Sequence, residues 1–482
     1  MNTLYYGDNL DILRRYVPDE TVDLIYLDPP FNSKATYNML FEEHDGSKSA
    51  AQFQAFEDTW HWDHIAAAAY QEVAEHGEKV SQAIIAMRQI LGESDMLAYL
   101  SMMAIRLIEL RRVLKPTGSI YLHCDPTASH YLKIVMDMIF GKENFRNEIV
   151  WHYQRWPAKQ KNFQRMHDVI LFYSKENHEN IFDVLLEPLS EGTLKRWKGK
   201  KSKVEYAGDV RLVTKMTEED SPGRPMDDVW DIAVINSQAK ERLGYPTQKP
   251  LALLERIIQA SSNPDDLILD PFCGCGTAVV AAQKLGRRWI GIDVTHVAIT
   301  VMKQRLIDTF EPDPNFKVIG EPTTVEDAQE LAETDPYQFQ WWALSLVGAR
   351  PIEQKKGADK GIDGRLYFHD SEGGETKQVI FSVKAGNTNA AHVRDLRGVI
   401  DRENAAIGVL ITMEEPTKPM RSEAASGGSY TSPWGTHLKL QILTVKELLE
   451  GKKIDMPPVR QVNVTFKRAT RTKGKGNQKT LL

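Results

Sequence analysis

A strand–loop–helix–strand unit at residues 267–293 is the feature that most constrains how this chain can fold. The apolar run 267–269 predicts a buried strand, and 278–285 predicts a helix after the intervening loop. A second strand is predicted at 288–292, directly before Asp293. Strands that alternate with helices are typical of α/β folds. The unit therefore predicts a doubly wound α/β domain.

The same alternation occurs earlier in the chain. A predicted amphipathic helix at 96–114 is stopped by Lys115-Pro116-Thr117-Gly118 and followed by a strand at 119–123. Further strands are predicted at 22–27, 148–153 and 169–173, and further helices at 128–140 and 251–261. Two stretches interrupt this pattern. We interpret 32–95 as an insertion followed by helix, and 154–230 as an irregular, basic and aromatic segment.

The length of 482 residues is too great for one hydrophobic core, so we expect several units. At 311–336 proline and acidic residues increase and periodicity falls, which predicts a linker. A second α/β unit is expected at 337–456, with a basic tail at 457–482. The first unit is expected to consist of two halves, 1–153 and 231–310, on either side of residues 154–230.

Composition excludes some classes of protein. Hydrophobic residues make up 42% of the chain, but no apolar run approaches the roughly 20 residues that cross a bilayer. We therefore expect no membrane association and a cytoplasmic location. The three cysteines are too few for a disulfide framework, and the Cys273-x-Cys275 spacing is poor for zinc.

Because the formal net charge is −6, a nucleic-acid partner would require local concentrations of Lys and Arg. One lies at the end of the chain, at 467–479. The other is a candidate DNA-binding cluster with an aromatic member, although a solvated charged loop would have the same composition. Its residues are Lys195, Arg196, Trp197, Lys198, Lys200 and Lys201.

The loop Asp270-Pro271-Phe272-Cys273-Gly274-Cys275-Gly276-Thr277 follows a predicted buried strand, where doubly wound sheets bind ligands. Gly274 and Gly276 allow the backbone to approach a ligand closely. Asp293, at the end of the next strand, could accept hydrogen bonds from both hydroxyls of a ribose. A tight turn with a helix cap would explain the same glycines.

The sequence of the loop 270–277 excludes some classes of ligand. A phosphate-binding loop would require a Lys-Ser/Thr pair after the last glycine, or a third glycine at the dinucleotide spacing, and neither is present. An adenosyl compound that is neutral or cationic fits better, with acidic residues at both ends of its site.

The tetrapeptide Asp28-Pro29-Pro30-Phe31 follows the predicted strand 22–27. The Asp28 carboxylate and the Pro29 carbonyl could accept the two N–H groups of an exocyclic amine, which directs the nitrogen lone pair outward. Phe31 could stack on a base extruded from a duplex. A Pro-Pro turn after an edge strand would give the same sequence.

These motifs, with Gly7-Asp8-Asn9 and Pro246-Thr247-Gln248-Lys249-Pro250, resemble the N6-adenine/N4-cytosine DNA methyltransferases in their β-class order. The resemblance covers about residues 1–310. It implies a seven-stranded, mostly parallel sheet and a target-recognition region at 154–230. By this resemblance Asp28, Pro29, Pro30 and Phe31 form the catalytic loop. The residues expected at S-adenosylmethionine are Asp8, Asn9, Thr247, Lys249, Asp270, Phe272, Gly274, Gly276, Thr277 and Asp293.

The resemblance also implies a reaction and a partner. The expected reaction moves a methyl group to N6 of adenine in double-stranded DNA, because a leading Asp is more usual with adenine and a leading Ser with cytosine. N4-cytosine and RNA methylation use the same cofactor chemistry and stay open. A restriction-modification or related defence system and a homodimer are also expected.

The C-terminal sequence 357–364, followed by the strand 378–384, resembles the restriction-endonuclease-like core of Mrr-type nucleases. Asp363 and Lys384 match that core, and Asp363 would be a ligand to Mg²⁺. Ser382 stands where Glu or Gln is expected, and its hydroxyl is a weaker metal ligand. The domain is therefore either a nuclease or an inactive DNA-binding module.

Overall fold

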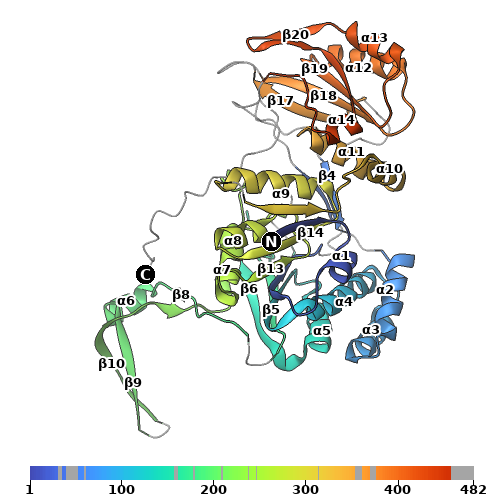
Figure 1. Ribbon diagram of the computed structural model, residues 1–482. Helices are drawn as coiled ribbons and strands as arrows, with labels where there is room; N and C mark the ends of the chain where they lie inside the picture. Colours follow the sequence, from blue (N-terminus) through green and yellow to red (C-terminus); the bar gives the residue numbers. More distant parts are fainter. Residues whose placement is uncertain are drawn as a thin grey trace.

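The computed structural model describes the chain as two α/β units (Figure 1). In what it describes, no helix combines the length and the apolar character needed to span a membrane. The described residues are 1–30, 35–39, 53–58, 61–156, 161–176, 180–207, 210–236, 238–245, 247–312, 314–352, 361–369 and 376–457.

The first unit is built on a nine-stranded, mostly parallel sheet. Only β7 is antiparallel to its neighbours, β5 and β6. The predicted α/β class is confirmed, but the sheet has more than the seven strands expected. In spatial order the strands are β12 (Val229–Asp231), β6 (Phe145–His152), β7 (His167–Ser174), β5 (Leu114–Cys124), β2 (Val22–Leu27), β13 (Leu267–Asp270), β14 (Arg288–Asp293), β1 (Asn2–Tyr6) and β15 (Phe316–Ile319).

Strands β1, β12 and β15 were not predicted from the sequence. Each has five residues or fewer, and most of their residues are partly buried or exposed. Such short runs carry little periodicity, so the partner strand rather than the local sequence decides that they pair. β2, by contrast, is buried on both faces along its whole length, which explains its continuous apolar run.

Helices cover both faces of this sheet. One face holds a cluster that includes Ile25 and Leu27 of β2, and the opposite face holds one that includes Leu24 and Tyr26. The helices of the first face are α1 (Asn9–Tyr16), α2 (His64–Glu75), α3 (Lys79–Leu91), α4 (Asp95–Val113) and α5 (Ser129–Phe140), with the short 3-10 helix η1 (Lys142–Asn144). Those of the second face are α7 (Leu251–Ser261), α8 (Thr277–Lys284) and α9 (His296–Thr309).

The two irregular stretches contain more regular structure than we expected. Within 32–95, β3 (Ala35–Met39) and β4 (Phe53–Asp58) form an antiparallel pair before α2 and α3. Within 154–230, β7 belongs to the main sheet, so this stretch is not one separate region. β12, which begins at Val229, also belongs to the main sheet, and the elements between β7 and β12 form an arm that projects from the sheet (Figure 1). Its elements are β8 (Leu186–Glu187), α6 (Glu191–Trp197), β9 (Lys200–Ala207), β10 (Val210–Asp220) and β11 (Arg224–Pro225).

The prediction of a linker at 311–336 is wrong. This stretch contains β15, which pairs with β1, and α10 (Val325–Thr334). Thr324 and Asp327 form a capping box for α10, and Asp335 caps α11 (Pro336–Leu346), whose first residue is proline. The prolines and acids that suggested a linker are therefore helix-start signals.

The second unit is a five-stranded sheet with helices on both faces, which agrees with the α/β class expected for it. β17 and β18 are antiparallel, and β18, β19 and β22 are parallel. The strands are β16 (Arg350–Pro351), β17 (Gly364–His369), β18 (Thr376–Lys384), β19 (Ile407–Thr412) and β22 (Leu440–Thr444), with a separate hairpin of β20 (Ser429–Ser432) and β21 (Gly435–Leu438). The helices are α12 (Ala390–Arg402), α13 (Lys418–Ala425) and α14 (Val445–Leu449).

Candidate active site

A cavity of about 270 Å³ lies where β1, β2, β13 and β14 end. These strands are mutually parallel along the order β2, β13, β14 and β1, so their carboxyl ends meet at one edge of the sheet. Asp28 follows β2, Asp270 ends β13, and Asp293 ends β14. The volume of the cavity is close to the lower end of the range for small-molecule sites, which begins at roughly 300 Å³.

Most of the residues predicted for the catalytic and cofactor loops line this cavity. Phe31 lies outside the described residues. Gly276 does not line the cavity, and it has another role described below. Those that do are Asp8, Asn9, Asp28, Pro29, Pro30, Thr247, Lys249, Asp270, Phe272, Gly274, Thr277 and Asp293.

The loop after β13 is tied to the end of β14 by the side chain of Asp293. Its Oδ2 atom accepts a hydrogen bond from the backbone N–H of Gly274 at 2.9 Å, and Oδ1 accepts from the N–H and hydroxyl of Thr295. Gly274 has a φ of +48°, and an added Cβ would lie 3.2 Å from the ring of Tyr245. The loop conformation therefore requires glycine at this position.

Gly276 shapes the loop from behind the cavity. It precedes α8 with a φ of +74°, and a Cβ there would lie 2.6 Å from Cγ and Sδ of Met302. Arg305, on the same helix as Met302, donates to the carbonyl of Cys275 at 2.9 Å and to the hydroxyl of Thr277 at 3.1 Å. α9 thus packs directly against the outer side of this loop.

Two carboxyl groups of the cavity have raised pKa values. Burial raises the pKa of Asp270 well above its usual value, and the nearby charges of Asp28 and Asp293 add to that effect. Burial also raises the pKa of Asp293, despite the hydrogen bonds from Thr295 and Gly274. A positive charge bound in the cavity would favour the ionised form of both groups, so the site is suited to a cation.

Asp28 forms a buried ion pair with Lys249. The Lys249 ammonium donates to Oδ2 of Asp28. Oδ1 of Asp28 is buried and has no hydrogen-bond partner among the residues that the structure describes, and it lies 3.9 Å from Nδ1 of His123. A buried carboxylate oxygen without a partner is costly, so it marks a position where a hydrogen-bond donor can bind.

His123 is central to a network behind Asp28 that we did not predict. Its Nδ1 atom lies 2.9 Å from the hydroxyl of Tyr26, and Nε2 lies 3.3 Å from Oδ2 of Asp168. The hydroxyl of Tyr153 donates to the other oxygen of Asp168 at 3.0 Å. Burial alone would raise the pKa of Asp168, but its partners, His123 first, lower it overall. Nothing in the sequence linked these four residues, which come from four different strand ends.

Arg106 of α4 was also missed. Its side chain is buried, and it donates at 2.6 Å to both Oδ2 of Asp8 and Oδ1 of Asn9. Asn9 in turn donates to the carbonyl of Pro271 at 2.8 Å. Arg106 thereby joins α4 to two loops of the cavity. The sequence feature that could have indicated a role for Arg106 is its position in an otherwise apolar stretch of the predicted helix 96–114.

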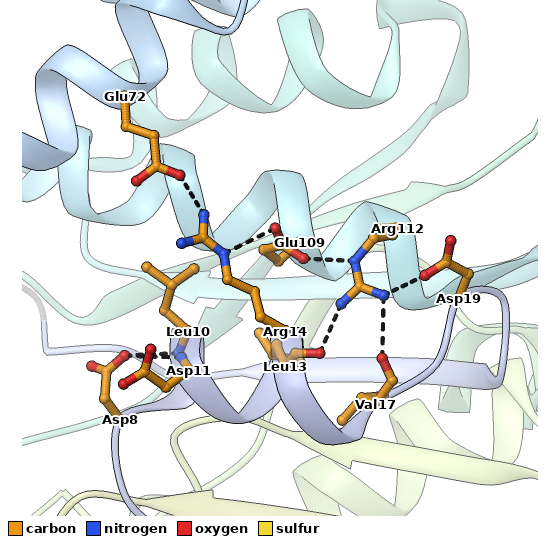
Figure 2. Close-up of polar contacts among 10 residues, drawn as sticks. All are labelled: Asp8, Leu10, Asp11, Leu13, Arg14, Val17, Asp19, Glu72, Glu109 and Arg112. Carbon is orange, nitrogen blue, oxygen red and sulfur yellow. Dashed lines mark hydrogen bonds and ion pairs between the residues drawn. The ribbon is translucent and has the colours of Figure 1, made fainter.

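The helix that begins at Asp8 is held at both ends (Figure 2). Asp8 accepts from the N–H of Leu10 at 2.9 Å, and at the other end Arg112 donates to the carbonyls of Leu13 and Val17. Between them Arg14 reaches Glu109 of α4 at 3.2 Å. These contacts fix α1 against α4 and so fix the position of Asp8 at the cavity.

The basic cluster lies on the projecting arm. Lys195, Arg196 and Trp197 belong to α6, which has no buried residue, and Lys198 follows in a left-handed conformation. Lys200 and Lys201 of β9 form 2.7 Å ion pairs with Asp220 and Glu219 of β10. Acidic neighbours therefore balance part of this positive charge, and DNA binding by the cluster stays a prediction.

In the second unit the structure brings the three expected residues together. Oδ2 of the buried Asp363 accepts from Ser382 at 3.2 Å and from the N–H of Val383 at 2.7 Å, and Nζ of Lys384 lies 3.6 Å away. Across the parts of the chain that the structure describes, no group of three or more His, Cys, Asp or Glu side chains could hold a metal ion. The expected Mg²⁺ site is therefore not supported, because Ser382 does not supply the carboxylate that such a site requires.

Comparison with known proteins identifies relatives of both units. An N6/N4 methyltransferase family model, described as DNA methylase, matches residues 22–304. A model described as NACHT-associated inactive Restriction Endonuclease 1 matches residues 337–450. The second unit is therefore similar to an inactive nuclease family rather than specifically to the Mrr type.

Individual proteins are similar over most of the first unit. Type II methyltransferase M.EcaI of Enterobacter cloacae is 28% identical over 359 residues, which cover 63% of this chain and 69% of that protein. DNA adenine methyltransferase YhdJ of Escherichia coli is 27% identical over 340 residues, covering 69% and 93%. The DNA modification methylase TTHA0409 of Thermus thermophilus, solved with S-adenosyl-L-methionine, is 17% identical with a TM-score of 0.39, covering 67% and 100%.

The family match spans more than half of the chain and includes the strands and loops that form the cavity. Asp28, Lys249, Asp270 and Asp293 all fall inside the matched residues 22–304. The protein belongs to the DNA methylase family of N6/N4 methyltransferases.

Proposed function

We propose that this protein transfers a methyl group from S-adenosylmethionine to the N6 amine of adenine in double-stranded DNA at a specific sequence. The observation that carries the proposal is the buried, unpaired Oδ1 of Asp28 at the cavity that also contains Asp270 and Asp293. The leading Asp of the catalytic loop favours adenine, and the relative YhdJ is an adenine methyltransferase by name.

The cavity fits S-adenosylmethionine in charge and in shape. The two buried carboxyl groups with raised pKa values, Asp270 and Asp293, suit a ligand with positive charge. Asp293 has one acceptor position left for a ribose hydroxyl, on Oδ2, because Oδ1 already accepts two hydrogen bonds and Oδ2 accepts one. Gly274 leaves room beside the ring of Tyr245. When bound, S-adenosylmethionine would supply an electrophilic methyl group on its sulfonium sulfur.

The residues of the catalytic loop would orient the target amine. Oδ1 of Asp28 can accept one N–H of the amine, and the carbonyl of Pro29 can accept the other. The nitrogen lone pair then points away from both acceptors. Lys249 donates to Oδ2 of Asp28, and this contact limits the rotation of the carboxylate. Positioning of this kind, together with electrostatics, is how the chain itself would accelerate the reaction.

Product analysis tests the reaction directly. Unmethylated plasmid DNA is incubated with the protein and radiolabelled S-adenosylmethionine, digested to nucleosides, and analysed by mass spectrometry. We expect N6-methyladenine from the wild-type protein and none from Asp28→Ala. N4-methylcytosine would replace the adenine assignment, and preferential labelling of structured RNA would replace DNA as the substrate. No label in any acceptor, with Asp28→Ala indistinguishable from wild type, would refute the proposal.

For the second unit we propose DNA binding without cleavage. Asp363 is held by Ser382, Val383 and Lys384, and this group supplies a single carboxylate. We expect no Mg²⁺-dependent nicking of supercoiled plasmid by the wild-type protein. Nicking that Lys384→Ala abolishes would contradict the proposal and restore a nuclease role.

The biological setting and assembly are further proposals. M.EcaI is a type II methyltransferase by name, which supports a role in a restriction-modification or related defence system. The homodimer expected from the sequence can be tested by analytical ultracentrifugation of the full chain. A sedimentation mass equal to that of one chain at micromolar concentration would contradict it.

A further inference from the structure

Two aromatic side chains in the connection between β6 and β7 are almost completely exposed. We call residues 153–156 and 161–166 the β6–β7 loop. In it the side chain of Trp156 is 93% exposed and that of Phe163 is 101% exposed. Other tryptophans, such as Trp151 and Trp289, are buried in the cores. Exposed aromatic groups of this size indicate a contact surface.

Hydrogen bonds connect the two sides of this loop next to the aromatic residues. The N–H of Tyr153 donates to the carbonyl of Met166 at 2.9 Å, which continues the antiparallel pairing of the strands. The side-chain amide of Gln164 donates to the carbonyl of Trp156 at 2.9 Å. These bonds therefore connect the side of the loop that carries Trp156 to the side that carries Phe163.

The β6–β7 loop lies at the edge of the sheet that contains the cavity. β6 is antiparallel to β7, and β7 is antiparallel to β5, so β6 runs in the same direction as β5 and β2. A chain of contacts leads from the loop to the catalytic loop. Tyr153 contacts Asp168, Asp168 contacts His123, and His123 lies 3.9 Å from Asp28.

The loop also carries positive charge at this edge. Arg155, Lys161 and Arg165 are exposed, while the only titratable residue of the described loop that can become negative is the buried Tyr153. The Arg155 guanidinium lies over the Tyr153 ring at 4.8 Å, and Arg165 pairs with Asp125 at 3.0 Å. Cations next to aromatic faces are the usual combination for nucleic acid, because phosphates bind the cations and bases stack on the rings.

We infer that Trp156 and Phe163 enter the duplex beside the target base. When the target base is extruded, the two rings stack on the neighbouring bases that had been stacked on it. The inference rests on the proposed DNA methylation, because Oδ1 of Asp28 is buried and a paired base cannot reach it. The exposed rings supply the stacking that extrusion removes. Arg155, Lys161 and Arg165 bind the phosphates on either side and keep the rings at the site.

The experiment compares two substrates for each variant. The methylated sequence is first mapped on plasmid DNA with the wild-type protein, and oligonucleotide duplexes containing it are then prepared. One duplex is fully paired. In the other, the target base lies opposite an abasic position, so its extrusion does not require a base pair to be broken. We expect Trp156→Ala and Phe163→Ala each to lower kcat/KM on the paired duplex about tenfold or more, the size of one lost base stack. On the abasic duplex we expect values within about threefold of wild type.

Ile90→Ala is the control, because Ile90 of α3 is another large exposed apolar side chain, 77% exposed, and it lies outside both the cavity and the unit for which we propose DNA binding. It should behave as wild type on both duplexes. Equal losses for the loop variants on both substrates would overturn the inference, since the rings would then hold the target base itself. Wild-type rates on the paired duplex would overturn it as well. If the wild-type protein methylates no DNA, the proposed function fails instead.

Discussion

Lys249 and Asp28, 221 positions apart in the chain, form the ion pair that joins the catalytic loop to the loop before α7. The pair occupies one oxygen of the Asp28 carboxylate and leaves the other buried without a hydrogen bond. Because only one oxygen is free, an incoming amine has a single direction of approach to the carboxylate. Lys249 was expected from the sequence only as a cofactor contact, and its contact with Asp28 gives it a part in arranging the catalytic loop.

We first predict that Lys249→Met lowers kcat for methyl transfer by about 100-fold, because removing one partner of a buried pair leaves an uncompensated charge that costs about 3–5 kcal/mol. The Asp28 carboxylate would then lose the contact that fixes its orientation. Lys249→Arg should recover part of the rate, since it restores the positive charge. The measurement is single-turnover transfer from labelled S-adenosylmethionine to duplex DNA.

Lys284→Met is the control for this change. Lys284 pairs with Glu255 at 2.6 Å on the surface, where such pairs contribute about 0–1 kcal/mol. This variant should keep the wild-type rate. A Lys249→Met protein that is as active as Lys284→Met would show that the buried pair has no role in the reaction.

The second prediction concerns pH. The pKa of Asp270 is raised by burial, so in the free protein its ionisation costs stability. That group's stabilising contribution is complete below its usual pKa of 3.8 and is lost as the pH rises through the raised value. Binding of a cationic ligand depends on pH in the opposite sense, because the ligand binds best when the Asp270 carboxyl group is ionised.

Affinity for S-adenosylmethionine should therefore fall as the pH is lowered through the raised pKa values of Asp270 and Asp293, where these groups take up protons, and we would measure it between about pH 8 and pH 5. Asp270→Asn should bind more weakly at high pH and show a shallower dependence on pH. Isothermal titration calorimetry in several buffers measures both quantities. An affinity that does not change with pH in the wild-type protein would exclude titration of these carboxyl groups in this range.

Third, Arg106→Lys should weaken cofactor binding about tenfold or more, although the charge is kept. The Arg106 side chain contacts Asp8 and Asn9 through different nitrogen atoms, each at 2.6 Å, and a single ammonium cannot reproduce that fork. Charged hydrogen bonds of this kind contribute about 1.5–3 kcal/mol each. Equilibrium binding should show the change, and an unaltered Kd would mean that Asp8 and Asn9 do not need Arg106.

Fourth, Gly276→Ala should be much more harmful than Gly286→Ala. Both glycines have a φ of +74°, so both substitutions share the backbone strain of about 1–2 kcal/mol. Only at Gly276 would the new Cβ meet Met302, at 2.6 Å, and crowding of that kind adds about 1–3 kcal/mol. Urea unfolding compares the two proteins. Equal losses of stability would show that Met302 moves aside without cost.

Several parts of the candidate site could be predicted because they are local in sequence. Asp28, Asp270 and Asp293 each follow a predicted buried strand, and parallel strands deliver their carboxyl ends to one edge. Helix α7 begins and ends where its pattern predicted, at Leu251 and Ser261. The linker prediction failed because Thr324, Asp335 and Pro336 are helix-start signals as well as loop residues.

By itself, the sequence determined the alternation of strands and helices, the order of the motifs and the family to which they belong. Those properties depend on spacing and periodicity over a few residues. Only the tertiary structure decided that Lys249 pairs with Asp28, that His123 connects Tyr26 to Asp168, and that Arg106 of α4 binds Asp8 and Asn9. Each of these contacts unites segments far apart in the chain. The reason is physical, since a buried charge or polar group takes the partner that folding brings within about 3 Å, whatever its position in the sequence.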